Sequence, residues 1–121
     1  MPKVNLSGFG FNVSEDVTAS TKTLDAGDNG VVQNVLATST ITLPATAVGA
    51  TFIVRVGADK VTVAISPNSA DNIVGNGRDT GVDNKDLLFT NQPAGSYVVL
   101  LGNGAGGYNV QRINGTATFE S

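Results

Sequence analysis

The chain of 121 residues contains no cysteine, no histidine and no tryptophan. Without cysteine there can be no disulfides, thiolate nucleophiles or thiolate metal ligands. Without histidine the chain lacks the side chain most often used for acid–base catalysis. Paired carboxylates are the remaining option, but candidates such as Glu15, Asp59 and Asp86 lie in turn-like segments, where Asp commonly stabilises its own turn. We therefore expect no enzymatic activity.

Charge is also scarce, at 14% of residues against about 25% in a typical globular domain. Seven basic and ten acidic residues give a net charge of −3, and the basic residues are scattered. Nucleic-acid binding requires a concentrated set of cations, so we expect no nucleic-acid partner. The longest purely apolar run, Val98 to Leu101, is too short to span a membrane. The N-terminus lacks the apolar core of a signal peptide. Together with the absence of cysteine, these features predict folding in a reducing cytoplasm, with no membrane partner.

Three glycines, Gly102, Gly104 and Gly107, have the G-x-G-x-x-G spacing of dinucleotide-binding folds. That fingerprint requires a helix after the glycines and an acidic residue about 20 positions further on. Here the next stretch, Tyr108 to Ile113, alternates like a strand, and the sequence given ends at Ser121. The spacing therefore predicts a glycine-rich turn between two antiparallel strands, and no nucleotide cofactor.

Strand signals dominate the rest of the chain, and no window shows a sustained helical period. Alternating residues 51–56 and 61–66 predict one hairpin, and residues 96–101 and 108–113 predict another. Asn29-Gly30 is typical of a hairpin turn, and Pro44 marks the end of a strand. We predict an all-β fold, a small antiparallel β-sandwich or jelly-roll-like barrel, with a single domain over residues 17–121.

Residues 1–16 form either an N-terminal arm or a first strand. Alternation places Phe9, Phe11 and Val13 on one side of an extended segment. In one interpretation this segment packs on the protein's own core. In the other it is an extended arm whose apolar face docks onto a partner protein.

The stretch 67–86 is long for an irregular loop, so it either has a function or contains short strands around Ile73 and Val82. Oxygen ligands such as Asp71, Asp79 and Asp83 are spaced closely enough to suggest a hard cation, but not as in an EF-hand. Solvated turn residues are the favoured interpretation, and a structural calcium ion is the alternative. Tyr97 and Tyr108 lie in predicted strands, which favours packing roles over carbohydrate recognition.

Several short motifs together carry a family resemblance. They are Thr42-Leu43-Pro44-Ala45, Val48-Gly49, Thr51-Phe52-Ile53-Val54, Val98 to Leu101, Gly106 to Val110 and Gly115-Thr116. In this order they resemble the small β-sandwich units of capsid decoration (cement) proteins of tailed bacteriophages, which also occur in phage fibre modules. The resemblance covers about residues 23–117.

The resemblance implies a homotrimer on the outer surface of the virion capsid, bridging major capsid protein subunits of neighbouring capsomers and stabilising the expanded head. Our hypothesis is that Phe9, Phe11 and Val13 contact the capsid. The alternative is a tail fibre or receptor-binding module that contacts host-surface glycans. The short length favours decoration, because a fibre protein generally carries an attachment region and a shaft.

Overall fold

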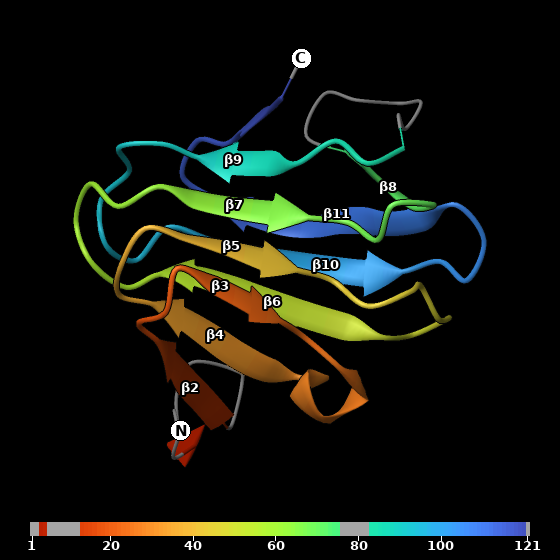
Figure 1. Cartoon of the computed structure of the whole chain (residues 1–121), viewed down its shortest axis with the longest axis horizontal. Helices are drawn as coiled ribbons and strands as arrows, with labels where there is room; N and C mark the ends of the chain where they lie inside the picture. The colour runs from red at the N-terminus through yellow and green to blue at the C-terminus, as the bar shows by residue number, and fades with distance from the viewer. Residues whose placement is uncertain (1–2, 5–12, 76–82, 121) are drawn as a thin grey trace.

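The computed structural model describes residues 3–4, 13–75 and 83–120, and shows an all-β protein with two facing sheets (Figure 1). The larger sheet contains, in spatial order, β1 (Lys3–Val4), β2 (Val13–Val17), β4 (Val31–Val35), β6 (Thr51–Val56), β10 (Tyr97–Gly102), β11 (Gly107–Asn114) and β8 (Asn72–Val74). The smaller sheet contains β12 (Thr118–Phe119), β9 (Leu87–Phe89), β7 (Val63–Ser66), β5 (Ser39–Thr42) and β3 (Thr21–Thr23). A 3-10 turn, η1 (Ala26–Asp28), precedes β4.

Alternation along each strand explains why the two sheets pack together. In β6, Phe52, Val54 and Val56 point between the sheets and are fully buried. Buried residues of the smaller sheet, among them Ile41 and Ile65, meet them from the other side. Each such side chain contributes about 1.5–3 kcal/mol by leaving water, so this apolar layer is the main source of stability.

The first half of the chain winds between the two sheets. Strands β2, β4 and β6 lie in the larger sheet and β3, β5 and β7 in the smaller one, so consecutive strands alternate between layers (Figure 1). Within each sheet, neighbours among these six strands are parallel. The second half returns through antiparallel pairs that join β7 to β9, β6 to β10 and β10 to β11.

This winding corrects the expected antiparallel sandwich or jelly roll. Five of the ten pairings among the described residues are parallel, whereas a jelly roll is built from antiparallel Greek keys. The all-β, two-layer prediction is confirmed. Alternation indicates which side chains face the core, but it carries no information about which strand lies alongside.

Two expected hairpins are wrong for the same reason. The strands over residues 51–56 and 63–66 lie in different sheets, and the segment between them crosses from one layer to the other. Asn29-Gly30 likewise joins two layers, although Gly30 does adopt the positive φ, 77°, that the turn motif predicts. A local turn signal marks where the chain changes direction, but it does not determine which sheet the next strand joins.

The predicted hairpin around the glycine-rich turn is confirmed. Strands β10 and β11 pair antiparallel from Tyr97↔Asn114 to Gly102↔Tyr108, with a bulge after Val99. The stretch 67–86 contains one predicted short strand, β8 around Ile73, while Val82 lies outside the described residues. Pro44 follows the end of β5, as expected.

The N-terminal segment is partly incorporated into the larger sheet. Val13–Val17 forms β2, which is parallel to β4, and Lys3–Val4 pairs antiparallel with Ser14 and Glu15. Residues 13–16 of this segment thus belong to a strand of the larger sheet. Phe9 and Phe11 lie outside the described residues.

Candidate functional site

Two loops that carry the family resemblance meet at one end of the sandwich, on the right of Figure 1. We call residues 44–50 and 102–107 together the loop end. The amide of Gly49 donates to the carbonyl of Gly102 over 3.2 Å, and the amide of Gly102 donates to the carbonyl of Ala50 over 2.7 Å. Motifs about 55 residues apart in sequence thus form one structural unit.

Thr46 fastens this unit to the rest of the fold. Its hydroxyl donates to the carbonyl of Gly107 over 2.5 Å and accepts from the amide of Gly104 over 3.1 Å. Its amide donates to the buried carboxylate of Asp71 over 2.9 Å. One short polar residue therefore joins three segments of the chain. The sequence carried no signal for this role, because Thr46 is unremarkable within its motif.

The three regularly spaced glycines are required by packing. A Cβ atom at Gly102 would overlap the carbonyl oxygen of Ala47, and one at Gly107 would overlap the backbone of Asn72. Gly104 has a φ of 77°, and its missing side chain leaves room for a methyl group of Val48. Protein backbone and side chains thus occupy the space around these glycines, which explains the spacing without a nucleotide.

Asn103 holds the turn itself. Its side-chain oxygen accepts from the amides of Ala105 and Gly107 at 2.9 and 3.0 Å, and its side-chain nitrogen donates to Asn109. These local bonds satisfy backbone groups that a glycine-rich turn would otherwise leave to water. The loop end is consequently pre-organised.

Tyr108 anchors the loop end to the core, which confirms its predicted packing role. The side chain is fully buried, its ring meets Phe52 edge-on at 5.9 Å, and its hydroxyl donates to the carbonyl of Pro44 over 2.8 Å. Burial, with a smaller contribution from the negative charge of Asp71, raises the pKa of Tyr108 to about 12. Tyr97 is half-buried and packs on a second apolar cluster of the larger sheet, formed by Val32, Ile53 and Val99.

The surface of the loop end is uncharged and partly apolar. Val48 is 84% exposed and is the one large hydrophobic side chain so exposed among the described residues. Its exposed neighbours include Ala47, Gly104 and Ala105, and residues 44–50 and 102–107 contain no charged side chain. Depletion of charge around an exposed apolar residue is the composition found at the centre of protein–protein interfaces.

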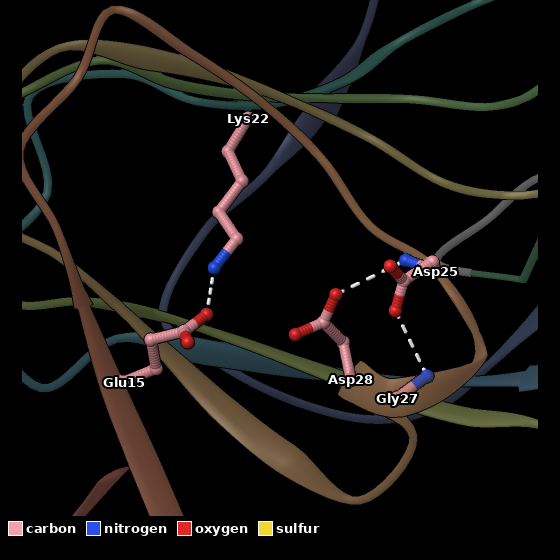
Figure 2. A network of polar contacts seen from close by, with 5 residues as sticks. All are labelled: Glu15, Lys22, Asp25, Gly27 and Asp28. Atoms are coloured by element: carbon pink, nitrogen blue, oxygen red, sulfur yellow. Dashed lines mark hydrogen bonds and ion pairs between the residues drawn. The ribbon is translucent and has the colours of Figure 1, made fainter. Parts of the chain in front are cut away.

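A second group of polar residues lies around β2, β3 and η1 (Figure 2). Lys22 of β3 forms an ion pair with Glu15 of β2, whose side chain is only 9% exposed. Close by, Asp25 and Asp28 form a capping box on η1, in which Asp25 accepts from the amide of Gly27 and Asp28 accepts from the amide of Asp25. These carboxylates therefore have structural partners.

Gln33 of β4 adds a buried polar side chain next to Glu15. It lies beside Glu15 in the register of β2 and β4, and on the same face, between the sheets. It is completely buried, and neither its side-chain oxygen nor its nitrogen has a hydrogen-bond partner. The sequence alone did not point to Gln33, because it lies between the apolar residues Val31 and Val35 on one face of the strand.

The other candidate carboxylates are dispersed. Asp59 accepts from the amide of Ala94 and Asp83 from the side chain of Asn72, so both stabilise loops. Burial raises the pKa of Asp86; a hydrogen bond from Ser66 opposes the shift, and the charge of Glu120 adds to it. Asp79 lies outside the described residues. Within the described ranges, no three acidic side chains gather in a way that could hold a metal ion.

An open depression of about 280 Å³ lies beside β3. It is lined by Asp16, Val17, Thr18, Ala19, Thr21 and Lys22. Asp16 is its one carboxylate, and this side chain accepts from Asn34 over 3.1 Å. The depression therefore brings no pair of carboxylates together for acid–base chemistry.

Of the three residues expected to contact a capsid, only Val13 lies among the described residues. Val13 is half-buried in β2, where alternation puts it on the same face as Glu15 and the core residue Val17. Phe9 and Phe11 lie outside the described residues, so their contact with a partner stays a prediction.

No model of a known protein family matches the chain, and no curated protein matches it. In the part of the chain that the structure describes, no helix has the length and hydrophobicity needed to cross a membrane.

Proposed function

We propose that this protein is a structural component of a phage virion, which binds the outside of the capsid as a homotrimer, bridges neighbouring capsomers and stabilises the expanded head. The observation that carries the proposal is that two segments with resemblance motifs, around Val48-Gly49 and around Gly106-Gly107, meet at the loop end. Residues 44–50 and 102–107, far apart in sequence, are joined by hydrogen bonds into one surface. In this proposal the surface contacts the major capsid protein.

The physical properties of the loop end support a protein contact. Its backbone is held by Thr46 and Asn103, so little conformational freedom remains to be lost on binding. Its exposed apolar residue is Val48, and the absence of charge avoids a desolvation penalty. In a homotrimer three such surfaces act together, which converts weak single contacts into strong attachment.

The proposal assigns no catalytic, metal-dependent or nucleic-acid-binding role. The described carboxylates act in ion pairs, caps and loop contacts, as Glu15, Asp25 and Asp59 illustrate. Phe9 and Phe11, together with Val13 in β2, remain the proposed second contact with the capsid. A decoration protein stabilises an expanded lattice by binding it preferentially, through mass action.

The test is co-sedimentation of the purified protein with phage heads stripped of outer proteins. We expect saturable binding in a fixed ratio to the major capsid protein. Val48→Asp should weaken binding by about tenfold or more, since about 1.4 kcal/mol of lost contact energy corresponds to that factor. Thr90→Asp adds the same charge at an exposed position after β9, at the opposite end of the sandwich, and should bind normally.

The N-terminal contact is tested separately with Phe9→Ser/Phe11→Ser. Substitution is preferable to deletion, because β1 and the buried Glu15 belong to the sheet. Undiminished binding of this variant removes the N-terminal residues from the proposal. If the unmodified protein does not bind phage heads but adsorbs to host cells, the proposal is wrong. The fibre alternative, with host glycans as ligand, then takes its place.

A further inference from the structure

The strand β3 forms an open edge of the smaller sheet. Among the described residues it pairs only with β5. The carbonyl of Ser20 and the amide of Leu24 point toward β5, where they bond Thr40 and Thr42. Backbone direction alternates along a strand, so the amides and carbonyls of Thr21 and Thr23 point outward. Both threonines are exposed, and such an edge is a template for strand pairing with another chain.

The inner side of the same edge is polar. Lys22 points between the sheets and pairs with Glu15, and Gln33 lies next to Glu15 with its amide group unpaired. Beyond this first layer the equivalent positions are apolar. Lys22 is followed across the smaller sheet by Ile41 and Ile65, and Gln33 is followed across the larger sheet by Val54. Polar groups are therefore concentrated where the parallel winding begins.

This placement changes what a strand added to β3 would encounter. The side chain of Lys22 is 24% exposed, whereas that of Glu15 is 9% exposed. A second molecule paired with Thr21 and Thr23 would cover the remaining open side of the ion pair. Both charged groups would then lose contact with water, which is unfavourable unless new polar partners replace the water. An inward-pointing charge on an edge strand is one known means of preventing edge-to-edge association.

We propose that the Lys22–Glu15 pair, supported by Gln33, closes the β3 edge against a second copy of this chain. The ion pair determines which chains can associate and does not stabilise the fold. Replacing a buried ion pair with apolar residues often causes no loss of stability. This inference does not depend on the proposed virion role. It also excludes the β3 edge from the interface of any native homo-oligomer.

The experiment replaces the pair with strand-forming apolar residues, in the double variant Glu15→Val/Lys22→Val. We expect a folded protein with a thermal midpoint no lower than that of the native chain. In sedimentation velocity it should form species larger than the native one, in proportion to concentration. Adding Thr23→Pro should restore the native state of association, because proline removes an outward amide and leaves the bonds to β5 intact. Thr21→Pro is a second blocking variant for the other outward amide.

Two controls keep the proposal falsifiable. Glu15→Gln/Lys22→Gln removes the charges but keeps polar groups, and should associate more than the native protein but less than the valine double variant. Thr23→Pro alone should also leave it unchanged. The proposal is overturned if the valine double variant associates no more than the native protein, or if it fails to fold. It is also overturned if its association survives both proline substitutions.

Discussion

The loop end and the β3 edge of the sandwich are built on different physical principles. At the loop end, segments distant in sequence approach closely through glycines and share backbone and hydroxyl hydrogen bonds, as at Gly102 and Thr46. At the β3 edge, by contrast, an ion pair between Lys22 and Glu15 joins the two layers. One region is rigid, uncharged and suited to contact. The other is charged and suited to prevent contact with another chain.

The largest expected effect comes from a substitution that disrupts the loop end. Gly107→Ala should destabilise the fold by about 3 kcal/mol or more, because φ is 150° and a Cβ atom would overlap Asn72. The free energy of unfolding from urea titration measures the loss. Gly106→Ala is the matched control, since its Cβ would have only ordinary contact with the Asn72 side chain. Equal losses in both variants would contradict the packing explanation.

The next effect breaks the β3 edge. Lys22→Ala should cost about 2 kcal/mol, because it leaves the carboxylate of Glu15 buried without its partner. Urea titration again provides the measurement. Adding Glu15→Gln to this variant should recover part of the loss, since the unpaired charge disappears. If the double variant is the less stable of the two, the ion pair does not explain the effect.

A smaller effect separates hydrogen bonding from packing at the loop end. Tyr108→Phe keeps the ring against Phe52 but leaves the carbonyl of Pro44 without its donor, at a cost of about 1 kcal/mol. The free energy of unfolding at pH 7 gives the magnitude.

The pH dependence of this variant provides a second check. The pKa of Tyr108 is about 12 in the fold and about 10 in the unfolded chain, so the neutral form stabilises the fold below pH 10. This contribution is lost as the pH rises from about 10 to 12. The advantage of the native protein over Tyr108→Phe should therefore shrink across that window in thermal melts. A difference that is constant with pH would contradict the raised pKa of Tyr108.

The smallest effect concerns a charge away from both regions. Because the pKa of Asp86 is raised, its ionised form opposes folding, and the penalty is present above the folded pKa. Asp86→Asn should thus be neutral or slightly stabilising at pH 7. The gain should disappear as the pH falls below the ordinary value of 3.8, where both states are protonated. A gain in melting temperature that persists in acid would contradict this assignment.

The candidate site could be predicted only in part. The hairpin of β10 and β11 and the packing role of Tyr108 followed from local alternation and glycine placement. The roles of Thr46 and Asn103 did not, because each depends on segments brought close by the fold. Lys22 and Glu15 also gave no signal, since their sequence separation of seven residues crosses between two layers.

The sequence by itself determined that this protein is all-β, where its turns lie and which strand faces are apolar, because these properties depend on residues close together in the chain. The tertiary structure decided which strands are neighbours. Residues 51–56 and 61–66 look like one hairpin, yet the strands that they form belong to different sheets. The physical reason is that alternation specifies a buried face, and several layer arrangements bury the same face. The parallel winding, the loop end and the closed β3 edge follow from that choice.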